Sequence, residues 1–488
     1  MVIDDKIRSE KLDAALSEEA VAGLDGTWTV EEETAVRRKL DWHVLPVVTV
    51  LYLLCFLDRN ARIQGLDKDL GLAGYDFNWA LTVFFVTYIL IEIPSNIMLK
   101  RVGPRAWIPF LTAGFGFVSL CIAFTHNFAD LCTARAFLGI FEGGMMPGVA
   151  FFLSCFYKRK ELLFRVGIYV SSASLAGAFG GLLAAGLTRV PEWGVASMRI
   201  HTWRNIFFFE GMITMLAGMI APIFMVSSPE KCGFLTERQR FIAAERILLD
   251  HKTSAYEQVK TRDVKRAIFN INNAICTLGF LLINITVQGI SLFMPTLLND
   301  LGWTATKAQL YTVPPYVTAS VGAICIAFIS DRTRQRGIYL AFCATLSITG
   351  FAILLADHDA NTKYMAIFFV TLGAWPGGPG FISWGLNNAG GSAVRAVTGA
   401  WISGVGTLGA LVATWSYLPN DAPNYPIGHS INLSAHCCIC VLALCGVAYC
   451  YWENRVRDKG GRDKRVLGLT EGEARELGYR HPEFRYIP

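Results

Sequence analysis

The stretch TARAFLGIFEGGMMPG, residues 133–148, lies in the middle of a long apolar run. Within it, Arg135 and Glu142 interrupt a segment that otherwise suits only hydrocarbon. Because these two residues are seven positions apart, a helix places both on one face, about two turns apart. A charge at bilayer depth costs at least ~2.5–3.5 kcal/mol, so such side chains face a bundle interior or a watery cavity. The pair is our first candidate for function, and a salt bridge that only pins helices together is the alternative.

The residues after Glu142 favour a bend in this helix. Gly143, Gly144, Pro147 and Gly148 follow the glutamate closely. Glycine permits close approach of a neighbouring helix, and proline interrupts the helical hydrogen bonds. We therefore expect the span to bend beside the charged pair.

The composition predicts an all-α membrane protein. The chain has 488 residues, of which 53% are hydrophobic and 17% charged, whereas soluble domains have ~45–50% apolar and ~25% charged residues. About twelve apolar runs, each long enough to cross the ~30 Å hydrocarbon core as a helix, recur along the sequence. The net charge of +5 is modest and gathers on one side of the predicted membrane. It therefore indicates membrane orientation and no partnership with nucleic acid.

The spans fall into two sets of six, as in transporters built from two repeats with a site at their interface. A hydrophilic linker with a short predicted helix at 236–250 separates the sets. Lysine and arginine gather in the loops on the side of both tails, which predicts that both tails are cytosolic. We expect a multi-pass protein of the plasma membrane. The predicted divisions are an N-terminal tail 1–42, a first bundle 43–226, a linker 227–265, a second bundle 266–453 and a C-terminal tail 454–488.

Further charges within predicted spans lie in the first half. Asp58 and Arg59 are adjacent in the first span and form a second functional candidate, with an ordinary membrane boundary as the alternative. Proton coupling is therefore expected in the first half. We assign four residues to structural pairing or gating, namely Glu92, Glu210, Asp331 and Arg332.

The second half offers neutral hydrogen-bonding groups and rings in its spans. Such side chains can select the body of a substrate by hydrogen bonding and stacking. Ordinary helix packing is the alternative for each of them. The candidate substrate-binding residues of this half are Asn284, Gln288, Tyr316, Trp384, Asn387 and Asn388.

One cluster superficially resembles a metal site. It comprises His436, Cys437, Cys438 and Cys440. On one helix, however, Cys437 and Cys438 point about 100° apart, and free cysteine is a common small buried residue. We expect no metal ion and no cofactor.

Several motifs carry a resemblance to a known family. They are YLLCFLDRN (52–60), IPSNIMLKRVGPR (93–105), RAFLGIFEGGMMPGV (135–149), WRNIFFFEG (203–211), SDRTRQRG (330–337) and WGLNNAGGSAVR (384–395). Through these motifs the chain resembles the major facilitator superfamily, and more closely its anion:cation symporter branch. The tail LGYRHPEFRYIP, residues 477–488, is similar to fungal allantoate, nicotinate and pantothenate permeases.

The resemblance implies roles for the charged pairs. In carboxylate:proton symporters of this branch, the acids that match Asp58 and Glu142 carry protons. The arginines that match Arg59 and Arg135 serve the substrate carboxylate. The resemblance also implies twelve helices in two six-helix repeats that alternate access to a central site.

We therefore expect proton-coupled uptake of a small organic anion by a monomer in the lipid bilayer, with a slight preference for a planar monocarboxylate such as nicotinate. Two alternatives stay open. One is efflux of a secondary metabolite or drug, although Gly177 is followed by Ala178 and not by the proline of the related antiporters. The other is a nutrient sensor that does not transport, although such sensors usually carry long tails. No motif of an enzyme stands out.

Overall fold

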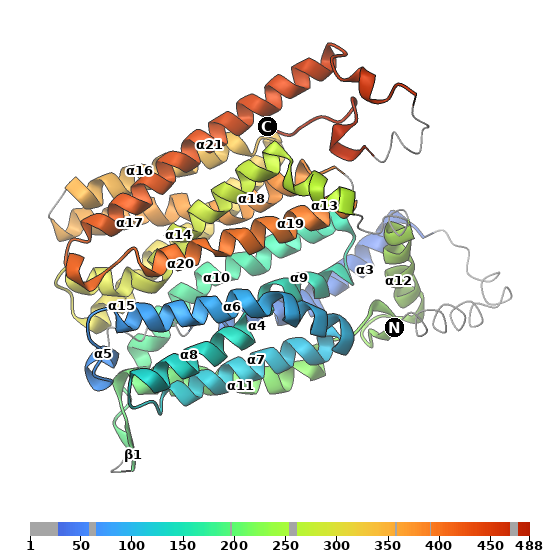
Figure 1. The fold of residues 1–488 in the computed structure, drawn as a ribbon. Helices are drawn as coiled ribbons and strands as arrows, with labels where there is room; N and C mark the ends of the chain where they lie inside the picture. Colours follow the sequence, from blue (N-terminus) through green and yellow to red (C-terminus); the bar gives the residue numbers. More distant parts are fainter. Residues whose placement is uncertain are drawn as a thin grey trace.

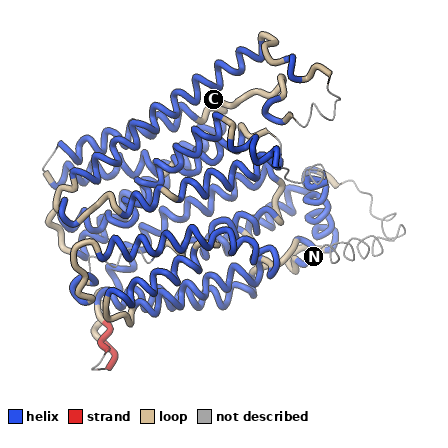
Figure 2. Tube along the Cα trace, viewed as in Figure 1, coloured by secondary structure: helices blue, strands red, loops and turns tan. Residues whose placement is uncertain are grey.

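Two helical bundles, one from each half of the chain, lie side by side in the computed structural model (Figure 1). The structure describes residues 28–57, 65–195, 198–252, 261–356, 359–390, 392–468 and 477–488. Within these ranges almost all of the regular structure is helical, and Figure 2 shows a single pair of short strands. The described parts of both tails lie at the same end of the molecule, which we call the tail end; the opposite end is the outer end.

The first bundle contains the helices that precede the linker. Their bounds are α3 Val30–His43, α4 Leu45–Leu54, α5 Leu66–Asp69, α6 Asp76–Val102, α7 Pro104–Ile122, α8 Phe128–Glu142, α9 Met145–Ser154, α10 Arg159–Leu187 and α11 Thr202–Phe224.

The linker and the second bundle follow. Their helices are α12 Glu237–Lys252, α13 Thr261–Ile268, α14 Ile271–Asp300, α15 Ala305–Thr333, α16 Gly337–Ala356, α17 Ala360–Ala374, α18 Gly377–Asn387, α19 Ser392–Thr407, α20 Gly409–Thr414 and α21 Pro426–Asp458. Short 3-10 turns occur at Pro229–Lys231, Pro419–Asp421, Asp463–Arg465 and Gly478–Arg480.

These helices supply the twelve predicted spans, because three spans are each built from two consecutive helices: α8 with α9, α17 with α18, and α19 with α20. Within the described residues, eight spans are long and apolar enough to cross a membrane by length and composition alone. The prediction of an all-α membrane fold is confirmed.

The predicted bend after Glu142 is present, since α8 ends there and α9 begins at Met145. Glycine is required at this bend because α6 lies directly against it. A Cβ atom at Gly143 would lie 2.5 Å from the Tyr88 carbonyl oxygen, and one at Gly144 would lie 1.9 Å from Ser95 Oγ. Neither distance is tolerable, so the glycines allow α8 and α9 to pack on α6.

A small hairpin extends from the outer end, where the sequence predicts only a loop. Strands β1 Trp193–Val195 and β2 Met198–Ile200 are antiparallel, with Trp193 opposite Ile200. Trp193 Nε1 donates to Asn205 Oδ1 over 2.8 Å and ties the hairpin to α11. The strands are too short to give an alternating pattern in the sequence.

The linker helix α12 packs against the tail end of the first bundle through a buried arginine. The Arg246 side chain has no exposed surface, and its guanidinium lies 3.4 Å from Glu161 Oε2 and 3.7 Å from Glu33 Oε1. Its Nη2 also donates to the Phe156 carbonyl oxygen over 2.8 Å. Helices α3, α10 and α12 therefore share one ionic cluster, which we call the linker cluster.

Further ion pairs extend the linker cluster between α3 and the start of α10. Lys158 forms an ion pair with Glu33 of α3. Arg165 of α10 donates to both carboxylate oxygens of Asp41, each over 2.7 Å. The short helix predicted in the linker is confirmed as α12, while its attachment to the N-terminal helix is a new finding.

Candidate functional site

The charged pair of α8 is buried inside the first bundle. Arg135 is 8% exposed and Glu142 is 5% exposed. The Arg135 guanidinium carbon lies 5.8 Å from the centre of the Phe207 ring on α11, within reach of a cation–π contact. Two ionisable side chains on one face of a membrane helix are thus held away from lipid, as the sequence predicts.

Tyr316 lies where the two bundles meet. It is buried, and its ring is edge-on to Trp375 with centroids 5.4 Å apart. Gly177 of α10 packs against the same ring, since a Cβ atom there would lie 2.8 Å from it. The Tyr316 ring therefore joins α15 and the α17–α18 break to the first bundle.

Asn284 and Gln288 lie one turn apart on α14 and are half-buried. Asn284 Nδ2 donates to the carbonyl oxygen of Phe280 in its own helix over 3.1 Å. This contact uses the amide nitrogen of Asn284, and its side-chain oxygen is an acceptor only.

Trp384 and Asn388 do not lie with these residues, which differs from the expectation of one substrate site. Both are buried near the tail end of α18. Trp384 Nε1 and Asn388 Nδ2 donate to the Ile487 carbonyl oxygen over 2.8 and 2.9 Å. In this conformation the returning tail occupies their polar groups, so we leave both out of the proposed substrate site. Asn387, the last residue of α18, is half-buried beside them.

The residues assigned to pairing or gating lie in separate places. Glu92 is half-buried in α6, and Glu210 is 2% exposed in α11. Asp331 is exposed and pairs with Arg336, whereas Arg332 is an exposed neighbour. The other candidates of the first span, Asp58 and Arg59, lie outside the described residues.

Hydrogen bonds at the outer end hold the two bundles together. Trp415 Nε1, just after α20, donates to Thr82 Oγ1 of α6 over 3.0 Å. Asn78 Nδ2 donates to the Thr414 carbonyl oxygen. The Trp415 ring is also edge-on to Trp79, with centroids 5.1 Å apart. We call Asn78, Trp79, Thr82 and Trp415 the outer clasp.

The outer clasp was not predicted from the sequence. Its four members are neutral, and none interrupts an apolar run in the way that a charge does. Tryptophan near a span end is an ordinary membrane-interface signal, so Trp79 and Trp415 carry no mark of their contact. Asn420 Nδ2 donates to Tyr75 OH over 2.8 Å and extends the same junction.

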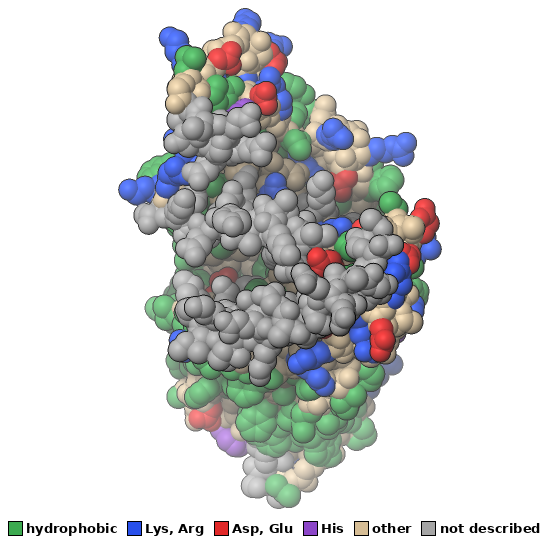
Figure 3. Space-filling model, turned by 90° about the vertical axis from the view of Figure 1, so that its right-hand side faces the viewer, with side chains coloured by type: hydrophobic (Ala, Val, Ile, Leu, Met, Phe, Trp, Pro, Cys, Tyr) green, Lys and Arg blue, Asp and Glu red, His purple; other side chains and the backbone are tan. Residues whose placement is uncertain are grey.

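The tail end of the molecule carries basic side chains. Figure 3 looks onto this end and shows lysine and arginine side chains around its rim. Exposed examples, from loops and helix ends of both bundles, are Arg101, Arg105, Arg332, Arg334 and Arg395.

Comparisons with known proteins agree on one family. The sequence profile described as Major Facilitator Superfamily matches residues 48–414. The MFS-type transporter efuF of Hormonema carpetanum is 30% identical over 432 residues, which cover 87% of each chain. The major facilitator-type transporter hxnP of Emericella nidulans is 29% identical over 497 residues, which cover 97% of each chain.

Solved structures show the same fold. A bacterial homologue of the human lysosomal transporter Spinster, in an inward-facing and unoccupied conformation, aligns with a TM-score of 0.61 at 14% identity, covering 86% of this chain and 96% of that one. The fucose:proton symporter FucP of E. coli aligns with a TM-score of 0.52 at 15% identity, covering 82% and 98%. The chain is thus a membrane transporter that belongs to the major facilitator superfamily.

Proposed function

We propose that this transporter couples the uptake of a small organic anion to the entry of protons. The observation that supports this most is the burial of Arg135 and Glu142 on one helix that has to cross hydrocarbon. Burial of a cation and an acid at that depth costs free energy unless each interacts with a ligand or with the other. The superfamily match makes a transported ligand the natural partner.

Charge balance in the site couples the entry of the anion to the entry of a proton. A guanidinium binds a carboxylate in a bidentate manner, so Arg135 is the proposed anchor for the anion. The substrate then adds a negative charge near Glu142 in a low-dielectric site, which favours the protonated form of that acid. Protonation of Glu142 keeps the loaded site neutral, so anion and proton cross together. Asp58 and Arg59 stay proposed as the second pair of the same kind.

We propose that the part of the substrate away from its carboxylate binds to the second bundle. Tyr316 and Trp375 present two edge-on rings at the junction of the bundles, and Asn284 offers an amide oxygen on α14. Rings select flat ligands by stacking, and single polar groups fix their orientation. A planar monocarboxylate, such as nicotinate, fits this chemistry best.

Access is proposed to alternate by rocking of the two bundles. The outer clasp closes the outer end in the structure described here. The basic rim of the tail end favours a cytosolic position for that end, and a plasma-membrane location puts the outer clasp outside the cell. Opening of the outer clasp then admits anion and proton.

The test replaces Glu142 by Gln, which keeps the shape of the side chain and removes its titration. In cells with a labelled substrate, E142Q should lose accumulation driven by acidic medium but retain exchange of labelled for unlabelled substrate. Glu210→Gln, at another buried acid of the first bundle, is the matched control: a residue of pairing or gating changes the rate of transport, but accumulation should still depend on acidic medium. Acid-driven accumulation by E142Q at the wild-type level would overturn the assignment.

A further inference from the structure

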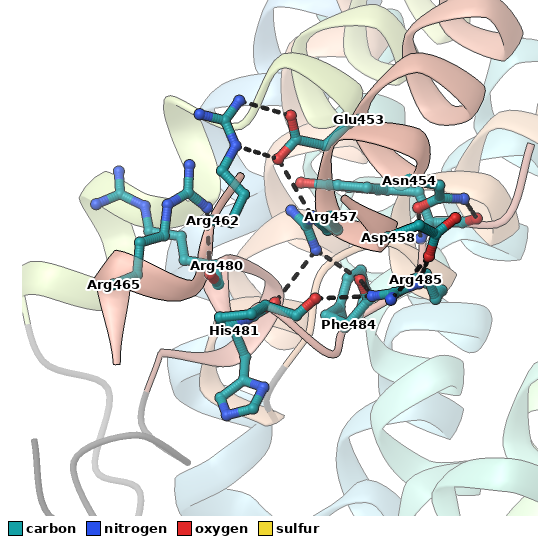
Figure 4. Close-up of polar contacts among 12 residues, drawn as sticks. Glu453, Asn454, Arg457, Asp458, Arg462, Arg465, Arg480, His481, Phe484 and Arg485 are labelled. Atoms are coloured by element: carbon teal, nitrogen blue, oxygen red, sulfur yellow. Dashed lines mark hydrogen bonds and ion pairs between the residues drawn. The ribbon is translucent and has the colours of Figure 1, made fainter. Parts of the chain in front are cut away.

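The tail motif 477–488 folds back onto the second bundle at the tail end, which the transport proposal does not explain. Its last residues lie across the start of α16, the end of α18 and the end of α21. Figure 4 shows the polar contacts around this segment. The segment is held chiefly by its backbone.

Two asparagines each bind both backbone groups of one tail residue. Asn454 Oδ1 accepts from the Tyr486 N–H over 2.9 Å, and Asn454 Nδ2 donates to the Tyr486 carbonyl oxygen over 2.9 Å. Asn388 Oδ1 likewise accepts from the Ile487 N–H over 2.8 Å, and Asn388 Nδ2 donates to the Ile487 carbonyl oxygen over 2.9 Å. A carboxamide that pairs with N–H and C=O of one residue imitates the pairing of a neighbouring strand.

Donors from the bundle also meet the neighbouring carbonyl groups. Arg457 Nη1 donates to the Phe484 carbonyl oxygen over 2.7 Å, and the Arg336 N–H donates to the Pro488 carbonyl oxygen over 2.6 Å. Trp384 Nε1 adds a second donor to Ile487. The carbonyl groups of four tail residues, 484 and 486–488, therefore each find a donor on the bundle.

Side-chain contacts give the segment a preferred sequence. The Tyr486 ring is 3% exposed and lies 4.8 Å from the Arg457 guanidinium carbon. It also lies edge-on to Phe484, with centroids 5.3 Å apart. An aromatic residue at this position fills a defined place.

Arg457 is itself held in position for this task. Its Nε donates to Glu453 Oε1 over 3.1 Å, and Arg462 binds the same carboxylate, as Figure 4 shows. The exposed pair between Arg485 and Asp458, at 2.9 Å, helps to set the register but adds little energy.

We propose that the tail end of the second bundle is a peptide-binding site whose occupant is residues 484–488 of the same chain. The site recognises an extended peptide by paired backbone hydrogen bonds and a buried aromatic side chain. When it is occupied, it fastens the start of α16 and the end of α18 to α21. This fastening role rests on the proposed rocking of the bundles. With the tail bound, the fastened helix ends move as one body, and with the site empty transport is slower.

The binding test keeps the full chain intact during folding. A recognition sequence for a specific protease is inserted between residues 469 and 476, and the purified protein is cleaved in detergent. Size exclusion with mass spectrometry then follows whether the 477–488 fragment stays with the transporter. A fluorescent synthetic 477–488 peptide measures exchange into the same site.

The fragment should stay bound to the wild type and leave about tenfold faster from Asn388→Ala and Asn454→Ala, since each loses two hydrogen bonds. Asn387→Ala is the matched control and should retain it. Trp384→Phe removes the indole N–H that donates to Ile487, along with part of the buried ring, and should also release the fragment faster than the wild type. Equal release from the wild type and all variants, or a scrambled peptide that binds as well, would overturn the site.

The transport arm is separate. Reconstituted wild type is assayed before cleavage, after cleavage and washing, and after addition of the synthetic peptide. Slower transport that the peptide restores supports the fastening role. Unchanged transport after complete release would overturn that role and leave both the binding site and the proposed substrate coupling to their own tests.

Discussion

Replacement of Trp415 by Ala should open the outer end of the transporter. The change removes one hydrogen bond to Thr82, with a net contribution of about 1 kcal/mol. It also removes ring contacts with Trp79 and with Tyr75, whose centroids lie 5.1 and 6.0 Å away, each contributing at least ~0.5 kcal/mol. The outer-closed state therefore loses about 2 kcal/mol, which shifts its ratio to the outer-open state about 30-fold.

Single-molecule fluorescence transfer can measure this shift. Dyes are attached through non-natural residues at Ala73, which is exposed shortly before α6, and Thr304, which is exposed at the N-cap of α15. Helices α6 and α15 both begin at the outer end (Figure 1). In W415A the population with the dyes far apart should grow about 30-fold relative to the compact one. Trp401→Ala, at a partly exposed tryptophan of α19, is the control and should leave the distribution unchanged. An unchanged distribution in W415A would refute the reasoning that the outer clasp holds the bundles closed.

Two further predictions concern the linker cluster. Arg246→Gln should lower the melting temperature in detergent strongly, because it removes the fully buried cation between Glu161 and Glu33; breaking a buried pair costs about 3–5 kcal/mol, which is an upper value here because Lys158 still pairs with Glu33. Arg238→Gln, which breaks an exposed pair with Glu32, should change it little, and equal shifts would contradict the role of Arg246. The second prediction is a pH effect at Glu33. Burial raises the pKa of Glu33, but the hydrogen bond and charge of Lys158 and the charge of Arg246 outweigh burial, so the Glu33 pKa lies below the usual 4.5. Because the pKa of Glu33 is depressed in the folded protein, the stabilisation by its ionised carboxylate is present above about pH 4.5 and is lost as the pH falls through the folded pKa. The difference in melting temperature between wild type and Glu33→Gln should therefore be full at neutral pH and vanish in acid. A difference independent of pH would contradict this prediction.

The fold was predictable because its signals are local. Apolar runs of membrane length predict the spans, and Gly143 with Gly144 predicts the break between α8 and α9. The burial of Arg135 and Glu142 followed from the cost of a charge in hydrocarbon. The hydrophilic stretch after α11 likewise predicted the linker and the helix α12.

The site was less predictable because its neutral residues gain their roles from contacts distant in sequence. Trp384 and Asn388 look like ligand-binding residues within an apolar span. Their hydrogen-bonding partner is Ile487, about a hundred positions later. Trp415 and Thr82 come from different bundles, and no periodic pattern links them. Residue type showed that these side chains need partners, and only the folded chain shows which partners they have.

Uptake of labelled carboxylates tests the central claim most directly. Cells that express the transporter receive nicotinate, pantothenate, biotin or allantoate at external pH 5 and 7.5, with and without a protonophore. The account predicts that one compound accumulates, faster at pH 5, and that the protonophore abolishes the accumulation. Faster export of a preloaded compound, with no acid-stimulated uptake of any of the four, would contradict proton-coupled uptake and favour efflux.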